Sequence, residues 1–143
     1  MRRFLPYLII LTVALAITLF CNRTQTETPS VGPGTPTVER AFADRRSDLW
    51  LETTGTVQRE IADDNDPPRH QRFILELDSG HTVLVAHNID LAPRIDSIRE
   101  GDTVSFYGEF QSNPQGGVIH WTHHDPQGRH PGGWLRHEGK TYE

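Results

Sequence analysis

The chain has 143 residues, of which 35% are hydrophobic and 23% charged, and its formal net charge is −5 at pH 7. This length corresponds to one domain once the ends are set aside. Without Arg2 and Arg3, the 14 basic residues fall to 12 against 19 acidic ones, a balance of −7; such a charge argues against nonspecific nucleic-acid binding, which needs a positive field.

The N-terminus carries an uncharged apolar segment of 18 residues, 4–21, preceded by Arg2 and Arg3. It predicts a membrane anchor or signal segment over residues 1–21, with the arginines on the cytoplasmic side. We favour an uncleaved anchor; a lipoprotein modified at Cys21 and a form cleaved after residue 16 are the alternatives. We therefore expect a bacterial inner-membrane protein whose domain faces the periplasm or cell exterior, with lipoprotein and secreted forms left open.

Three further features divide the chain. Cys21 is the only cysteine, so no internal disulfide forms. Residues 22–37 are rich in threonine, proline and glycine and predict a flexible linker. The remaining residues, 38–143, predict one domain, which begins with one or two helical turns because Val38, Ala41, Phe42 and Leu49 recur at helical spacing.

Alternating apolar residues then predict five strands, at residues 49–61, 71–77, 82–87, 103–110 and 118–124. Leu91, Ile95 and Ile98 predict a short helix over residues 90–99, between the third and fourth strands. This order indicates an all-β fold, namely a small five-stranded OB-like barrel with one short helix. An antiparallel meander gives similar strand signals, but the intervening helix favours the barrel. A small hairpin around Glu138 and Gly139 is expected near the C-terminus.

The turn between the second and third strands sets their register. If Ser79 and Gly80 are its two turn residues, Arg72 lies opposite His87, and His70 and His87 share a face at the open end of the hairpin. That face is a binding surface, or else the N-terminal helical turns cover it. In the fifth strand, Ile119 and Trp121 are expected to face the core and His120 to point outward.

Five of the eight histidines fall between residues 120 and 137. One interpretation is a zinc site, or a site for another divalent transition metal, because zinc takes three imidazole nitrogens and keeps an open position when it is catalytic. A metal-dependent hydrolase is the enzymatic form of this alternative. Residues three apart on a strand point to opposite faces, which counts against the site. The candidate metal residues are His120, His123, His124, Asp125 and His130.

The first interpretation is a noncatalytic binding module with a histidine-rich ligand site, and no catalytic residue is assigned. Its partner would be a small molecule, a glycan or a protein, with nucleic acid disfavoured by the acidic charge. The structural alternative is that the histidines only bond the backbone of a segment rich in glycine and proline. The candidate ligand-binding residues are His70, His87, Asn88, Asp90, Trp121 and Trp134.

The segments RHQRFILELDSGHTVLVAHNIDLAPRI, GDTVSFYGEF and GGVIHWTHHDPQGRHPGGWLRHEGKTY resemble a bacterial family of unknown function, whose members are small and usually exported. The resemblance covers residues 50–142 and includes the HNIDLAP and HWTH-DP-G-H-GGW patterns. It implies no activity. The residues that match the family pattern are His70, His87, Asn88, Asp90, His120, Trp121, His123, Asp125, His130 and Trp134.

Overall fold

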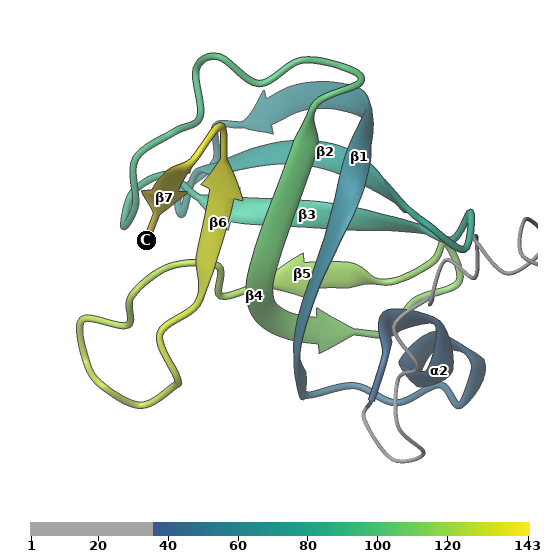
Figure 1. Cartoon of the computed structure of the whole chain (residues 1–143). Coiled ribbons are helices and arrows are strands. Elements are labelled where there is room, and N and C mark those ends of the chain that lie inside the picture. The colour runs from purple at the N-terminus through teal and green to yellow at the C-terminus, as the bar shows by residue number, and fades with distance from the viewer. Residues whose placement is uncertain (1–35) are drawn as a thin grey trace, which may run out of the picture. The chain divides into compact units, whose positions relative to one another are not determined.

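A computed structural model describes residues 36–143 of the chain (Figure 1). The predicted membrane segment, 1–21, and nearly all of the predicted linker therefore lie outside the described residues. The described part is mostly β structure with one short helix, α2 (Val38–Ala43). Within this part, no helix is long and apolar enough to span a membrane.

Seven strands follow α2, and five of them lie where alternation predicts strands. β1 runs on to Asp64, whereas β5 stops at His120 instead of continuing to residue 124. The strands are β1 (Leu49–Asp64), β2 (His70–Leu77), β3 (Thr82–Asn88), β4 (Thr103–Gln111), β5 (Val118–His120), β6 (Trp134–His137) and β7 (Lys140–Tyr142).

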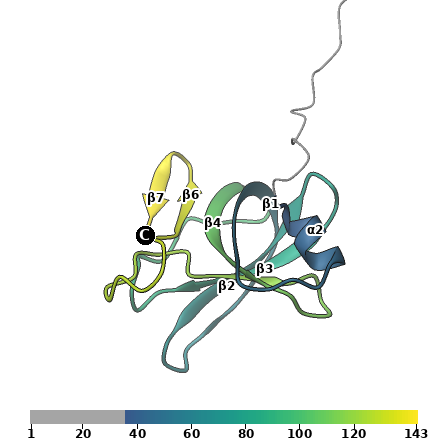
Figure 2. The same ribbon diagram turned by 90° about the horizontal axis from the view of Figure 1, so that it is seen from below.

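The first five strands form a closed ring in the order β1-β2-β3-β5-β4, because β1 also pairs with β4. Four of the five neighbouring pairs are antiparallel, and the pair β3–β5 is parallel, with Leu84 opposite Val118 and Val85 opposite Ile119. Figure 1 shows β1 and β4 crossing in front of β2, β3 and β5, and Figure 2 shows the ring from below.

The edge of β4 that faces away from β1 is shared by two strands. β5 pairs with residues 109–111 of β4, and β6 pairs with residues 104–107. Between them, residues 121–133 leave the sheet and return to it. β7 then pairs with β6 across a turn at Glu138 and Gly139, which confirms the predicted hairpin.

The inside of the ring is filled by the alternate side chains of its strands. Because successive strand residues point to opposite faces, one residue in two faces inward. Fully buried aromatic and branched residues dominate this core, as expected for strands of high β propensity. Its members include Phe73, Leu75, Val83, Val85, Val104, Phe106, Phe110 and Ile119, and Leu135 of β6 belongs to the same core.

Thr37 caps the N-terminus of helix α2, and its side-chain oxygen accepts a hydrogen bond from the Arg40 amide. Val38 and Ala41 are buried, and the Phe42 ring lies 4.9 Å from the ring of His81. The helix therefore packs at the turn end of the β2–β3 hairpin. The open end of that hairpin, which carries His70, is left uncovered by α2.

The register of the β2–β3 hairpin differs from the prediction by one residue. Three residues, 78–80, form the loop instead of two, and Gly80 takes a left-handed φ of 80°, as is common in three-residue hairpin loops. As a result Gln71 lies opposite His87, and His70 lies opposite Asn88. The expectation that His70 and His87 share a face is wrong, since a one-residue slip exchanges the two faces.

The helix predicted over residues 90–99 is also wrong, because the chain forms turns there. The apolar residues Ile95 and Ile98 of this segment are buried as expected. However, the buried side chain of Gln71 bonds both backbone polar groups of Ile95. It donates to the Ile95 carbonyl at 2.9 Å and accepts from the Ile95 amide at 2.9 Å. These two backbone groups are thereby withdrawn from helical pairing, and Pro93 has no amide hydrogen to offer.

β5 ends early because Trp121 takes a left-handed φ of 53°, a rare conformation for a bulky residue. Ile119 faces the core and His120 points outward, as predicted, but Trp121 is only half-buried and does not join the core. The next residue, Thr122, is fully buried instead. The chain therefore bends inward at the point where alternation predicts a continuing strand.

Candidate functional site

A pocket of about 240 Å³ lies on the outside of the ring, where β3 and β5 separate. Five predicted site residues line it, and they come from the open end of the β2–β3 hairpin and from the exit of β5. Its complete lining is Pro68, His70, Ala86, Asn88, Leu91, His120, Trp121 and His123. We call it the imidazole pocket, after its three histidines.

The ring nitrogens of these histidines are largely free of protein partners. Within residues 36–143, no hydrogen bond joins the rings of His70 or His120 to another group. The Nδ1 of His123 donates to the carbonyl of His124 at 2.8 Å, which leaves its Nε2 as an acceptor in the neutral ring. The pocket therefore offers unused donors and acceptors.

Among the pocket histidines, His120 is held toward its uncharged form. The pKa of His120 is lowered, first because burial penalises the charged ring and second because His70 lies nearby, while Glu109 acts in the opposite direction. A neutral imidazole donates from one nitrogen and accepts at the other. None of the lining residues is Asp, Glu, Lys or Arg, so the wall itself contributes no fixed charge.

His87 lies behind the pocket, inside the ring, with no exposed surface. Its Nε2 hydrogen is donated to the Pro93 carbonyl at 3.2 Å, and its Nδ1 accepts from the Thr122 hydroxyl at 2.8 Å; this tautomer follows because a carbonyl can only accept. Burial lowers the pKa of His87 to about 4, with smaller contributions from the charges of His123 and His70. His87 is a neutral core residue that supports the pocket without lining it.

Asp125 organises the loop between β5 and β6. Its buried carboxylate accepts hydrogen bonds from three backbone amides, those of Gln127, Arg129 and His130, at 2.7–3.1 Å. These bonds lower the pKa of Asp125, and the bond from the Gln127 amide has the largest effect. The carboxylate oxygens of Asp125, a candidate metal residue, are therefore occupied by the loop backbone.

Two other candidate metal residues, His124 and His130, lie on the same loop but do not line the pocket. The His130 ring stacks on Trp121 with centroids 4.1 Å apart, and His124 is exposed. In the part of the chain that the structure describes, no three histidine, cysteine, aspartate or glutamate side chains form a group that holds a metal ion. The predicted set around His120, His123 and His130 is thus not assembled in this conformation.

Besides His87, two more predicted ligand-binding residues lie away from the pocket lining. Asp90 accepts from the amide and side chain of Arg69 at 2.8 and 2.7 Å, which lowers its pKa. This pair ties the β1–β2 loop to the end of β3. Trp134 begins β6 and lies next to Tyr107, with ring centroids 6.4 Å apart.

Sequence reasoning missed the apolar part of the pocket. Leu91 is a large hydrophobic residue with 45% of its surface exposed, and its place in a helical pattern suggested burial. Pro68 lies in the loop between β1 and β2, and Ala86 faces outward from β3 in the observed register. No pattern in the sequence marks Leu91 as an exposed residue.

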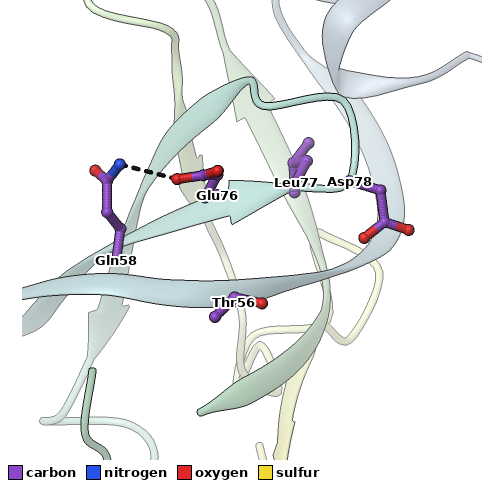
Figure 3. Close-up of a pocket in the computed structure, with 5 residues that line it drawn as sticks. All are labelled: Thr56, Gln58, Glu76, Leu77 and Asp78. Atoms are coloured by element: carbon purple, nitrogen blue, oxygen red, sulfur yellow. Dashed lines mark hydrogen bonds between the residues drawn. The ribbon is translucent and has the colours of Figure 1, made fainter. Parts of the chain in front are cut away.

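Two other hollows contain none of the predicted site residues. One, of about 320 Å³, lies over β1 and β2, and a Gln58–Glu76 hydrogen bond of 3.0 Å lies in its lining (Figure 3). The other, of about 710 Å³, lies between α2 and the loop that precedes β5. The imidazole pocket is therefore the hollow toward which the sequence analysis points.

Comparison with known proteins identifies a family. A family model described as "Protein of unknown function (DUF3465)" matches residues 23–143, which include the whole described part. No curated protein sequence matches the chain. The match covers most of the chain, and the protein therefore belongs to the DUF3465 family of proteins of unknown function.

Proposed function

We propose that this protein is a membrane-tethered, extracytoplasmic binding module and that the imidazole pocket is its ligand site. The observation that carries the proposal is the meeting of His70, His120 and His123, whose ring nitrogens are left largely without protein partners. Buried polar groups normally have a hydrogen-bond partner in the protein or in ordered water. A ligand that supplies these partners would complete the site.

The lining favours a small uncharged molecule. An imidazole in its neutral form and the Asn88 amide each donate and accept hydrogen bonds, and none of the lining residues is Asp, Glu, Lys or Arg. Leu91, Pro68 and Trp121 provide an apolar wall. The volume of about 240 Å³ is just below the usual range for drug-sized ligands, which indicates a small ligand. Because the wall is apolar and the imidazoles and the amide are polar, this ligand would have one flat apolar face and several polar groups along its edge.

The strand ring supports the same proposal. We propose that this ring, with its parallel β3–β5 pair and its β1–β4 closure, is an OB-like barrel, a fold that binds ligands on the outer face around strands 2 and 3. The imidazole pocket includes residues of both strands. Placement outside the cytoplasm and tethering by residues 1–21 rest on the apolar N-terminal sequence and its two arginines.

The test follows the imidazole C–H resonances of the full chain by NMR, in a detergent without a sugar headgroup. The probes are monosaccharides, nucleobases and phenols, added singly, with Zn²⁺ in a separate arm. The variants His70→Gln, His120→Gln and His123→Gln assign the pocket signals. His124→Gln, which changes an exposed ring outside the pocket, is the matched control.

We expect at least one uncharged probe to move the signals of two or more pocket histidines and to leave that of His124 in place. His120→Gln should weaken binding of that probe by about tenfold, the effect of one lost hydrogen bond. If no organic probe moves these signals, the proposal is refuted. If Zn²⁺ alone moves them, the divalent-metal alternative replaces it.

A further inference from the structure

A second surface with the character of a binding site lies on the outer face of β1, β4 and β6. Trp50, Tyr107 and Trp134 stand side by side there, one from each strand, and all three are half-buried. Their ring centroids are 5.3 Å apart between Trp50 and Tyr107 and 6.4 Å apart between Tyr107 and Trp134. We call these three residues the aromatic row.

Charged side chains alternate with the aromatic row in the strand register. Glu52 lies opposite Tyr107, and Glu109 lies opposite Trp50. On β6, the guanidinium carbon of Arg136 lies 3.9 Å from the centre of the Trp134 ring. Outward-facing residues of neighbouring strands share one surface, so aromatic faces, two carboxylates and one guanidinium form a continuous patch.

The two carboxylates have no partner within the patch. Among residues 36–143, neither Glu52 nor Glu109 forms a salt bridge or accepts a side-chain hydrogen bond, although Glu109 is only half-exposed. Glu109 lies opposite His120 on β5, so the patch borders the imidazole pocket without containing His70 or Asn88. It is therefore a separate candidate site.

From this geometry we infer that the aromatic row binds a neutral oligosaccharide. A pyranose ring presents a C–H face that packs on an aromatic ring, while its hydroxyls point sideways from that face. Hydroxyls donate to acceptor-only groups such as Glu52 and Glu109, and they also accept from Arg136. A ligand whose polar groups all donate and accept hydrogen bonds therefore suits a patch that contains both carboxylates and a guanidinium.

Other extended ligands fit this chemistry less well. Nucleic acid also stacks on aromatic rings, but its phosphates only accept hydrogen bonds and are repelled by the carboxylates and by the net charge of −7 beyond residue 21. A proline-rich peptide packs on aromatic grooves, but each proline lacks the N–H that a carboxylate requires. The hydroxyl-rich chain is the occupant that satisfies both kinds of group.

The experiment titrates the full chain with cellohexaose, chitohexaose and maltohexaose, using tryptophan fluorescence and calorimetry in a detergent without sugar. Trp50→Ala removes one ring of the aromatic row. Glu109→Gln keeps the shape of the side chain and removes its charge, which provides a test if the tryptophan variant fails to fold. His70→Ala, which alters only the imidazole pocket, is the matched control, and thermal melting checks the fold of each variant.

We expect at least one oligosaccharide to bind with millimolar affinity or better. Glu109→Gln should weaken it by about tenfold, as for loss of a hydrogen bond to a charged group, and Trp50→Ala by about fivefold or more. His70→Ala should leave it unchanged, so this inference and the proposed function stand or fall separately. Absence of binding by all three, equal binding by Glu109→Gln and the wild type, or binding of a proline-rich peptide in their place would overturn the inference.

Discussion

Acid provides a direct test of the buried imidazole behind the pocket. The pKa of His87 is about 4 in the folded protein, chiefly because burial disfavours its charged form, whereas an unfolded chain has a histidine pKa of about 6.5. Above pH 6.5 neither state binds this proton. Between 6.5 and 4 only the unfolded state binds it, so the folded state loses stability as the pH falls, and below 4 the loss stops.

The size of the loss follows from the interval between the two pKa values. At about 1.4 kcal/mol per pH unit, His87 should remove about 3 kcal/mol from the free energy of unfolding between pH 7 and pH 4. Such a loss is a large fraction of the stability of a small domain, which is typically about 5–15 kcal/mol.

Urea unfolding at a series of pH values measures this loss when the wild type is compared with His87→Gln. The variant should be less stable at pH 7, because the bonds to Pro93 and Thr122 are disturbed, but its stability should depend less on pH. The difference between the two curves should shrink by about 3 kcal/mol from pH 7 to pH 4. His124→Gln, which removes an exposed ring, is the control. A constant difference across this range would show that His87 is not held neutral by burial, and the reasoning would fail.

Three substitutions test the supports of the site. Gly133→Ala should lower the free energy of unfolding in urea by about 1–3 kcal/mol, because a Cβ there would collide with the Trp121 carbonyl and lie 2.7 Å from the Tyr107 carbonyl oxygen. The control is Gly132→Ala, which should leave the free energy of unfolding unchanged, because a Cβ at Gly132 would meet nothing closer than 3.9 Å. Gln71→Leu should lower the free energy of unfolding by about 1–3 kcal/mol, because it leaves the Ile95 amide and carbonyl without partners. The control Gln58→Leu, at an exposed position, should change it by less than about 0.5 kcal/mol. Equal effects of the two substitutions would contradict the role of Gln71. Asp125→Ala should speed hydrogen exchange at the Arg129 and His130 amides, which donate to its carboxylate, while unchanged exchange would show that the loop holds its shape without it.

Much of the ring was predictable because strand periodicity is local. Phe73 and Leu75 on β2 alternate in the sequence and are buried in the structure. The hairpin at Glu138 and Gly139 was likewise visible in a short polar turn between apolar residues. These features depend on neighbours within a few residues, which is the range over which sequence patterns are informative.

The facing of individual side chains was harder to predict, because it depends on loop geometry and on distant partners. One additional residue in the loop at 78–80 sends His87 into the core and leaves His70 beside Asn88. The clamp of Gln71 on Ile95 joins positions 24 residues apart, and no local pattern announces it. The sequence indicated the region of the candidate site correctly, but not which imidazoles line it.

The shared edge of β4 has a mechanical consequence. Only residues 118–120 connect β3 to β4, through two parallel and three antiparallel residue pairs, whereas β1 and β4 are paired along eight residues of each strand. The free energy of local opening is lowest where few contacts hold the structure together. We therefore expect the ring to open first at the three residues of β5. A molecule bound in the imidazole pocket would contact Ala86 on β3 and His120 on β5. It would therefore stabilise the ring at the place where the fewest residue pairs hold it together.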